Sequence, residues 1–211
     1  IEYVRPDFEK MKKSAFGCAE KIKNATSYDE AKKAFLEFDK EECAFFDMVI
    51  VASVRHTIDT SDEFYDKEDE YLNEQIPEYS SAYMELANTL YDCAFKYDFV
   101  KEFGNSMFSN IEIQRKSYCE KNIPLLQKEA KLCSEYEKII ASADIVFDGK
   151  HLNLYGIMSY FENADRQVRH DAFKAYSDFY ASHEKRFEEI WDELIKIRTE
   201  QSKNLGFDNY I

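Results

Sequence analysis

Glycine and proline are scarce in this 211-residue chain, which contains five glycines and three prolines. A many-stranded β-sandwich needs such turn residues every few positions, so this class of fold is excluded. Five scattered glycines also cannot form a glycine-rich phosphate-binding loop. The low content of turn residues therefore excludes one large class of fold and one common class of nucleotide site.

Basic residues are also in deficit, because 28 lysines and arginines stand against 42 aspartates and glutamates, for a net charge of −14. Binding to nucleic acid needs clustered basic side chains, and so does attraction to an anionic membrane surface. We therefore expect neither a nucleic acid nor a membrane as partner. Hydrophobic residues make up 45% of the chain, which is too much for a disordered protein.

Long apolar runs and paired cysteines are missing as well. The longest apolar run, residues 44–54, contains Asp47 and is too short to span a bilayer. The five cysteines form no Cys-x-x-Cys pair, which argues against a disulfide framework or a zinc knuckle. No signal peptide opens the chain. We therefore expect a cytoplasmic protein with reduced thiols, of which Cys43, Cys93 and Cys133 fit buried helix faces.

The dominant hydrophobic period is helical, and it predicts an all-α fold, a multi-helix array with long helices and one short β-hairpin near residues 145–154. The hairpin signal is Asp148-Gly149 between two short apolar-alternating arms, and so short a hairpin must pack on helices to be stable. Residues 1–143 are predicted to form an N-terminal helical region, and residues 144–211 the hairpin and a long helix. The predicted helices span residues 7–24, 28–58, 60–76, 79–97, 108–118, 125–143, 156–161 and 165–205.

The predicted helix over residues 28–58 is apolar on two sides. Ser27 and Glu30 have the spacing of a capping box at its start. A helix that is apolar on two sides is normally buried on two sides, so we predict a central helix. One face carries Ala31, Ala34, Phe35, Phe38, Phe45, Val49 and Ala52, and the other carries Leu36, Cys43, Phe46, Ile50 and Val54.

Histidine spacing offers one candidate metal motif, and the motif is incomplete. Residues 183–187 begin like the zinc-binding His-Glu-x-x-His helix, but Phe187 stands where the second imidazole is needed. We therefore predict that His183 packs between Phe179 and Phe187. No glutamate stands three residues before any histidine, so the Glu-x-x-His of a di-iron bundle is absent too. No nucleophile set is visible either, and we assign no catalytic residue, no substrate-binding residue and no metal ligand.

An acidic stretch at residues 59–74 contains a single basic residue, Lys67. A calcium loop starting at Asp66 would need glycine at its sixth position and glutamate at its twelfth, where the chain has Tyr71 and Pro77. The favoured interpretation is a solvated helix face, with acids near the positive end of the helix dipole. The alternative is a negative rim that attracts cationic ligand groups. The acids are Asp59, Asp62, Glu63, Asp66, Glu68, Asp69, Glu70 and Glu74.

Separated blocks of sequence together resemble one known family. The blocks are residues 3–8 (Tyr-Val-Arg-Pro-Asp-Phe), residues 54–60 (Val-Arg-His-Thr-Ile-Asp-Thr) with 62–66 and Glu68, residues 132–136, 140–143 and 147–149, and residues 165–169, 197–200 and 204–207. In this order and spacing they resemble the oligoendopeptidase F family of zinc metallopeptidases, relatives of thimet oligopeptidase. The resemblance covers nearly the whole chain.

The resemblance implies a helical peptidase that encloses a channel and cleaves short peptides. In that family, zinc is held by a His-Glu-x-x-His helix and a further glutamate, and the motif lies downstream of the block at residues 204–207. The resemblance therefore implies that this chain is the N-terminal part of such an enzyme. It also implies that zinc belongs to the parent enzyme and that this part alone is inactive. The implied partners are the peptide substrate and the missing C-terminal catalytic region.

Within the matched blocks, helical spacing allows local polar pairs. Arg55 and His56 can each meet Asp59, which sits where the long helix should break. The favoured interpretation is a polar clamp at the join of two helices, and the alternative places Arg55 or His56 on the channel wall. Whether the acidic stretch 59–74 touches substrate is equally open. In the later block, Asp165 is a predicted N-cap that can pair with Arg169.

Two hypotheses about function follow. The first is an N-terminal, channel-wall part of a zinc-dependent oligopeptidase, which should expose an apolar patch where the missing region docks. The second is a free-standing acidic helical protein-interaction domain without catalysis, which should have a complete polar surface. The sequence does not indicate the peptide preference, the oligomeric state or whether this part folds alone.

Overall fold

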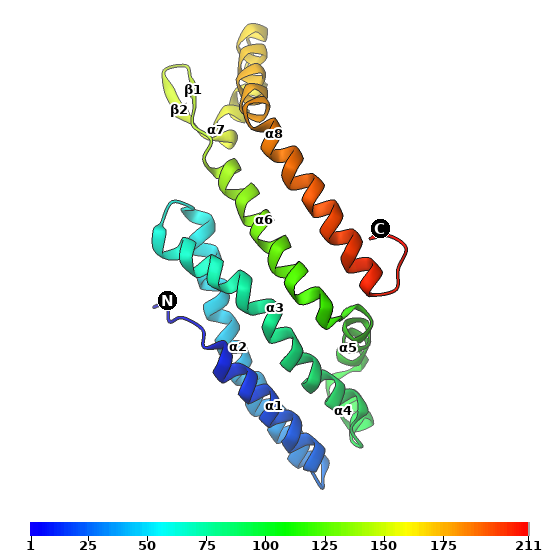
Figure 1. Ribbon diagram of the computed structural model, residues 1–211. Helices are drawn as coiled ribbons and strands as arrows, with labels where there is room; N and C mark the ends of the chain where they lie inside the picture. The colour runs from blue at the N-terminus through cyan, green and yellow to red at the C-terminus, as the bar shows by residue number, and fades with distance from the viewer. Residues whose placement is uncertain (211) are drawn as a thin grey trace. The chain divides into compact units, whose positions relative to one another are not determined.

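A computed structural model describes residues 1–210, in which eight α-helices and one two-stranded antiparallel sheet are present (Figure 1). The predicted class, all-α with one short hairpin, is confirmed. The elements are α1 (Phe8–Asn24), α2 (Tyr28–Ile58), α3 (Glu63–Asp92), α4 (Lys96–Phe103), α5 (Asn105–Ser117), α6 (Ile123–Ala141), β1 (Ile145–Phe147), β2 (Lys150–Leu152), α7 (Leu154–Met158) and α8 (Arg166–Asn204), with 3-10 turns at Glu120–Asn122 and Ser159–Glu162.

The described chain divides into two compact units. The first unit contains residues 1–127 and 201–209, and the second contains residues 128–200 with Tyr210. Asn122 explains why residues 201–209 belong to the first unit. Its side-chain amide donates to the Gln201 carbonyl at 3.1 Å, and its side-chain oxygen accepts from Asn204 at 2.8 Å. The predicted division between residues 143 and 144 concerned the domains of a longer protein and stays a prediction.

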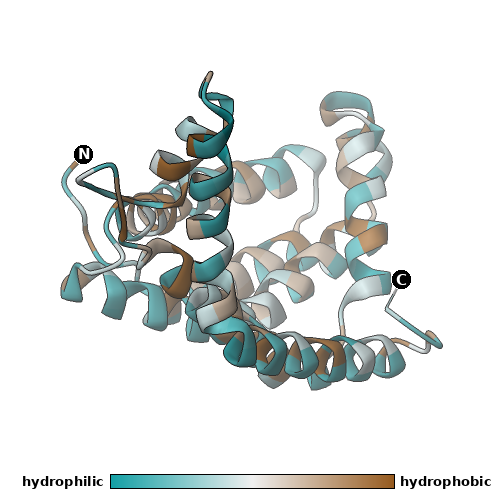
Figure 2. Cartoon of the chain, turned by 90° about the horizontal axis from the view of Figure 1, so that it is seen from above, coloured by the Kyte–Doolittle hydropathy of each residue, from teal (hydrophilic) through white to brown (hydrophobic). Residues whose placement is uncertain are grey.

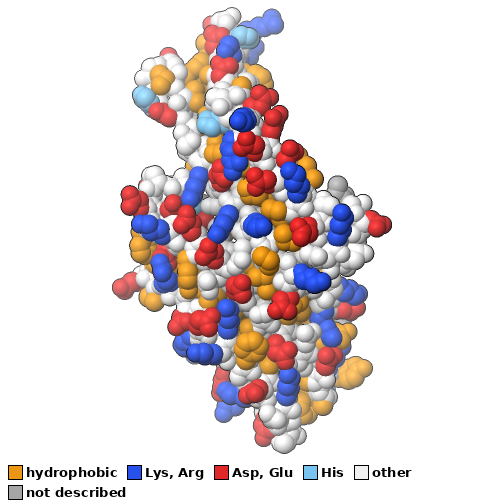
Figure 3. Space-filling view, in the orientation of Figure 1, with side chains coloured by type: hydrophobic (Ala, Val, Ile, Leu, Met, Phe, Trp, Pro, Cys, Tyr) orange, Lys and Arg blue, Asp and Glu red, His pale blue; other side chains and the backbone are white. Residues whose placement is uncertain are grey.

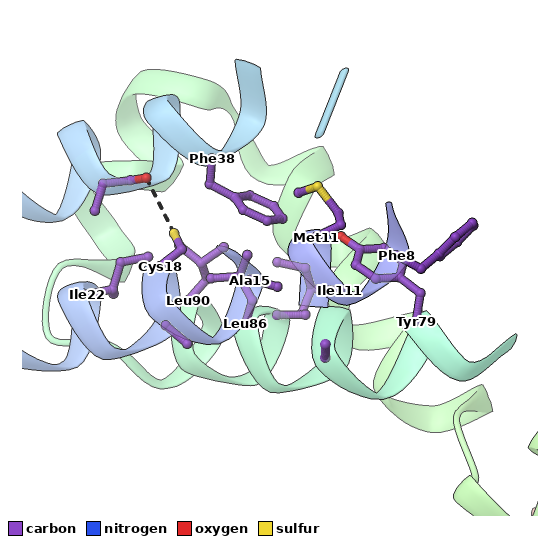
Figure 4. Packing of buried hydrophobic residues seen from close by; sticks show 14 of the residues in the cluster. Phe8, Met11, Ala15, Cys18, Ile22, Phe38, Tyr79, Leu86, Leu90 and Ile111 are labelled. Carbon is purple, nitrogen blue, oxygen red and sulfur yellow. Dashed lines mark hydrogen bonds between the residues drawn. The ribbon is translucent and has the colours of Figure 1, made fainter. Parts of the chain in front are cut away.

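In the first unit, α1, α2 and α3 lie side by side around an apolar core (Figure 1). Helix α1 begins where predicted, because the Asp7 carboxylate accepts a hydrogen bond from the Lys10 backbone N–H at 2.9 Å. The buried positions of α1 recur every three or four residues, so one side of the helix faces its neighbours. Figure 4 shows this side, Phe8, Met11, Ala15, Cys18 and Ile22, packed with Phe38, Tyr79, Leu86 and Leu90.

Helix α2 has the predicted start and end. The Ser27 hydroxyl accepts from the Glu30 N–H at 3.3 Å, and the Glu30 carboxylate reaches back to the Thr26 N–H at 2.8 Å, one residue earlier than in a capping box. The helix ends at Ile58, and Asp59 is its C-terminal cap residue. The polar ends of α2 are therefore satisfied by residues close in sequence.

The prediction that α2 is buried on both faces is wrong. Its first face is in the core, but on the second face Leu36, Ile50 and Val54 are 41%, 58% and 50% exposed. Cys43 on this face is also exposed, whereas the buried cysteine is Cys18. Burial raises the pKa of the Cys18 thiol to about 12. Periodicity identified both apolar faces correctly, but on the second face Phe46 packs against the core while Leu36, Cys43, Ile50 and Val54 are exposed.

The predicted helix end before Pro77 is also wrong, because α3 continues through this proline to Asp92. Proline cannot donate to the carbonyl four residues earlier, and its ring disturbs the preceding turn. The Gln127 side-chain amide donates to the nearby Glu74 carbonyl at 2.8 Å. Leu72 and Tyr79, one on each side of Pro77, are 2% and 3% exposed. Burial of apolar groups on both sides of the proline therefore outweighs its cost within the helix.

The predicted helix over residues 79–97 is interrupted, because α3 ends at Asp92 and α4 begins at Lys96. Phe99 in α4 is completely buried, and its ring centroid lies 5.1 Å from that of Tyr28 and 5.8 Å from that of Phe35. The chain turns between the two helices and places Phe99 against α2. Side-chain packing thus determines this helix end, which the local spacing did not indicate.

The predicted β-hairpin is confirmed in the second unit. Ile145 pairs with Leu152 and Phe147 with Lys150, in antiparallel register. Both turn residues have positive φ, 51° at Asp148 and 71° at Gly149, as a type I′ turn requires. The hairpin packs on helices as expected, through a small core of Ala143, Ile145, Leu154, Ile157 and Ala172.

Helix α8 ends at Asn204, one residue before its predicted end, and Gly206 follows it closely. Gly206 has φ +85°, the Phe207 N–H donates to the Ser202 carbonyl at 2.9 Å, and the Gly206 N–H donates to the Lys203 carbonyl at 3.0 Å. This pair of bonds is a Schellman motif.

Each helix carries both hydrophobic and hydrophilic residues along its length, as Figure 2 shows. No helix within residues 1–210 has the length and hydrophobicity to cross a membrane.

Candidate functional site

The most deeply buried polar group in the first unit is the carboxylate of Glu68 on α3, which is 1% exposed. Arg5 binds it through two nitrogens, with Nε 3.0 Å from each carboxylate oxygen, and the Tyr3 hydroxyl donates to Oε2. We call Tyr3, Arg5 and Glu68 the Glu68 network. It ties the extended N-terminal segment to α3, and all three residues lie in blocks on which the family resemblance depends.

The network keeps Glu68 ionised. Burial alone would raise the pKa of the Glu68 carboxyl, but the hydrogen bonds from Arg5 and Tyr3 outweigh burial and lower this pKa below its usual value. Burial and the hydrogen bond to Glu68 raise the pKa of the Tyr3 phenol, which therefore stays protonated and donates. The Arg5 guanidinium also lies over the Tyr71 ring, 4.8 Å from its centroid.

His56 and Arg55 lie beside this network at the end of α2. His56 is 2% exposed, with Nε2 3.4 Å from Asp66 Oδ1 and Nδ1 3.6 Å from Asp69 Oδ1. Arg55 donates to the Tyr65 hydroxyl and, at 2.6 Å, to the backbone carbonyl of Ile1. Both side chains thus join α2 to α3 or to the N-terminal segment. This arrangement is that of a clamp between α2, α3 and the N-terminal segment, and the placement of Arg55 or His56 on a channel wall stays a prediction.

Neither predicted pair with Asp59 is formed. The Asp59 carboxylate accepts instead from the Ser61 N–H at 3.0 Å and the Ser61 hydroxyl at 2.6 Å. These bonds lower the pKa of Asp59. A short polar side chain at a helix end satisfies nearby backbone groups more readily than a distant charge. The clamp therefore joins residues far apart in sequence rather than residues one helical turn apart.

The acidic stretch 59–74 is only in part the solvated face that we expected. Glu63, Glu70 and Glu74 are exposed, but Glu68 is buried, and Asp66 and Asp69 are partly covered beside His56. Local spacing could not reveal this, because the partners Tyr3 and Arg5 are more than sixty residues away in sequence. The one available signal was that both partners stand in a matched sequence block.

The later block behaves partly as predicted. The Asp165 carboxylate accepts from the Gln167 N–H at 2.7 Å, which confirms its capping role at the start of α8. Arg169 does not pair with Asp165, but donates to the carbonyls of Asn163 and Ala164 at 2.6 and 3.0 Å. Both residues therefore fix the turn that precedes α8.

The described residues do not fit a zinc site. Within residues 1–210, no group of three or more His, Cys, Asp or Glu side chains is arranged so that it could hold a metal ion. His183 is packed as predicted, with Nδ1 3.0 Å from the Phe179 carbonyl and its ring 4.7 Å from the Phe179 ring. On the face drawn in Figure 3, acidic and basic side chains are interspersed rather than gathered into one patch.

An apolar groove in the second unit was not foreseen from the sequence. It lies between α6 and α8, with a volume of about 540 Å³. Trp191, the only tryptophan in the chain, is 63% exposed at this groove, and Tyr136 is 43% exposed. Arg198 lines one part of the groove and forms an ion pair with Glu129 at 2.8 Å. The lining of the groove is mostly apolar, and Glu137, Glu188 and Arg198 are its charged members.

Comparison with known proteins gives one consistent result. The family described as "Peptidase M3 N-terminal domain" matches residues 1–118, which include the whole Glu68 network. The solved structure of PZ peptidase A with inhibitor 2 has a TM-score of 0.96 and 33% identity, covering 100% of this chain and 38% of that chain. A protein described as an oligoendopeptidase F from Bacillus anthracis str. Ames has a TM-score of 0.96 and 32% identity, covering 99% and 38%. No curated protein matches significantly. The chain thus spans 38% of the length of these solved relatives.

Proposed function

This chain belongs to the peptidase M3 family and contains its N-terminal domain, and from this premise we propose that it is the N-terminal helical part of a zinc-dependent oligopeptidase that hydrolyses short peptides. One observation carries the proposal. The whole chain superposes on part of PZ peptidase A with a TM-score of 0.96 at 33% identity. Agreement of fold and sequence over the full chain supports a shared function for the parent protein.

In the proposed enzyme, this part forms one wall of the substrate channel. The helical region 1–143 stands first, and the hairpin with α8 leads towards a catalytic region outside residues 1–211. Because the described residues do not fit zinc, the metal ligands belong to that other region. The Glu68 network then acts as a structural clamp that holds the N-terminal segment on α3. The proposed location is the cytoplasm, and the proposed partner is a short peptide.

The free-standing interaction domain is the weaker alternative. It required a complete polar surface, but the second face of α2 leaves several large aliphatic side chains exposed. Exposed apolar residues in such a row are characteristic of a surface that another protein segment covers. This observation favours a part of a larger protein over a separate acidic domain.

The proposal is tested with the complete gene product. We expect it to cleave a quenched fluorescent peptide of about ten residues, to lose this activity with a chelator, and to regain it with zinc. A protein precursor of several hundred residues is the matched control and should resist cleavage. Absence of chelator-sensitive peptidase activity would refute the proposal. So would an adjoining reading frame without a His-Glu-x-x-His sequence.

A further inference from the structure

The outward face of α2 carries a row of exposed apolar side chains, which we call the outer stripe and define as Leu36, Cys43, Ile50, Val54 and Ile58. Leu36 is 41% exposed, Ile50 58% and Ile58 79%. Val54 is 50% exposed, and Cys43 is also exposed. Single exposed hydrophobic residues are normal on protein surfaces. Five such residues on one helix need an explanation when they share one face.

The spacing places all five residues on one face. Steps of seven, seven, four and four residues at about 100° each confine the stripe to an arc of about 80°, along ~33 Å of helix. Two charged residues of opposite sign, Lys40 and Asp47, share this arc, so the stripe is electrically neutral in a protein of net charge −14. An apolar, neutral strip of this length has the character of a helix-packing surface.

The opposite face of α2 shows what such a strip does when it is covered. Ala31, Ala34, Phe38, Val49 and Ala52 are all less than 9% exposed and pack in the first core. The outer stripe has larger aliphatic side chains than most of these positions. Exposure of the outer stripe to water therefore loses the favourable free energy that burial of these apolar side chains would contribute.

We propose that the outer stripe is covered by the remainder of the same polypeptide, the region outside residues 1–211 that the proposed function assigns to catalysis. The inference rests on that proposed function. The solved relatives that share this fold have more than half of their chain outside the shared part, so they supply enough residues to cover the stripe. A second copy of this chain is the less favourable occupant, because each copy brings a charge of −14.

Cys43 is a natural probe of this surface. In the complete gene product, we expect a maleimide to label Cys43 at least tenfold more slowly than a cysteine introduced by Ile113→Cys on α5. Ile113 is 63% exposed and lies outside the stripe, which makes it a matched control. Labelling is followed residue by residue with mass spectrometry. Equal labelling of the two cysteines would overturn the proposal.

A second variant tests the contact directly. Ile50→Glu places a charge in the stripe and should raise the labelling rate of Cys43 towards that of the cysteine introduced on α5, while Ile113→Glu should leave the rate at Cys43 unchanged. Hydrogen exchange of α1 and α3 reports whether the first unit remains folded in each variant. If Ile50→Glu leaves Cys43 protected with the unit folded, the proposal is wrong.

The remaining outcomes separate this inference from the proposed function and from dimerisation. Protection of Cys43 that disappears on dilution, with a dimeric mass by light scattering, would assign the stripe to a second copy and overturn the proposal. Peptide cleavage with a reactive Cys43 would refute the covered stripe and leave the proposed function standing. A protected Cys43 without peptidase activity would refute the proposed function alone.

Discussion

Each compact unit contains an arginine–glutamate pair with two contacting nitrogens, and the two pairs differ in their exposure to water. In the first unit, Arg5 binds Glu68, whose side chain is 1% exposed. In the second unit, Arg186 binds Glu135 at 2.5 and 2.6 Å, and the two side chains are 36% and 41% exposed. Nearly the same arginine–carboxylate contact is therefore buried in the first unit and exposed to water in the second.

The difference teaches that burial, more than distance, decides what an ion pair contributes. Water and salt screen an exposed pair, and fixing two long side chains costs conformational entropy, so the net gain is small. A buried carboxylate has lost its hydration, and removing its partner leaves a charge that neither water nor protein stabilises. The Glu68 network should therefore be far more sensitive to substitution than the Arg186 pair.

The largest expected effect comes from Arg5→Ala. This change leaves the buried Glu68 carboxylate with the Tyr3 hydroxyl but without its counter-charge. We expect a loss of about 3 kcal/mol in unfolding free energy, the lower end for a broken buried pair, because the Arg5 side chain itself is 55% exposed. Urea unfolding at pH 7, with hydrogen exchange of α3 to locate the change, measures the loss.

Lys10→Ala is the matched control for this variant. Lys10 lies on α1 and pairs with Glu41 at 3.2 Å, but both side chains of that pair are exposed. We expect no significant change in the urea midpoint. If both variants lost the same amount, burial would not be the deciding factor and the comparison would break down.

A smaller loss is expected for Tyr3→Phe, which removes one hydrogen bond to Glu68 and keeps the ring. A hydrogen bond to a charged group contributes about 1.5–3 kcal/mol, and Arg5 remains in this variant, so we expect about 1.5 kcal/mol. The Tyr3 ring still contacts the Tyr65 ring, with centroids 5.8 Å apart. Urea unfolding of Tyr3→Phe, with Tyr97→Phe as the control at an 84% exposed phenol, checks the value. Equal midpoints for the two variants would contradict it.

The fold was predictable where the determining residues are close in sequence. The hairpin follows from the Asp148-Gly149 turn, and the start of α1 follows from Asp7, since both signals act within a few residues. The helix end before Pro77 was predicted wrongly for the opposite reason. Burial of Leu72 and Tyr79 against other helices keeps α3 continuous, and no local rule contains that contact.

The candidate site was harder to predict than the fold. The run of acidic residues was visible in the sequence, but it could not tell buried Glu68 from exposed Glu63 and Glu70, because the burial of Glu68 depends on the distant Arg5. The second face of α2 shows the converse. Ile50 has the apolar character of a buried residue, yet it is 58% exposed within residues 1–210. Sequence patterns indicate which residues are apolar enough to be buried, but they do not identify the segment that covers those residues.

Acid titration sharpens the comparison further. The pKa of Glu68 is lowered in the folded state, so its stabilisation is fully present above the unfolded pKa, about 4.3, and is lost as the pH falls through the lower folded value. We expect the hydrogen-exchange protection of α3 to decline below about pH 4.3 in the wild type. In Glu68→Gln, this decline should be smaller, because the titrating group is gone. An identical decline in both proteins would assign the acid sensitivity to other carboxylates.

The smallest effect is expected for Arg186→Ala, the exposed member of the comparison. Glu135 also has a lowered pKa, caused first by its hydrogen bond from Arg186. Yet water solvates both groups once they separate, and Arg186 also contacts Glu189 at 3.0 Å, so its charge is shared on a wet surface. We expect the urea midpoint to change by no more than the error of the measurement, and any change to vanish in about 0.5 M salt. A loss as large as that of Arg5→Ala would show that this pair stabilises the second unit through packing of the arginine stem rather than through its charge.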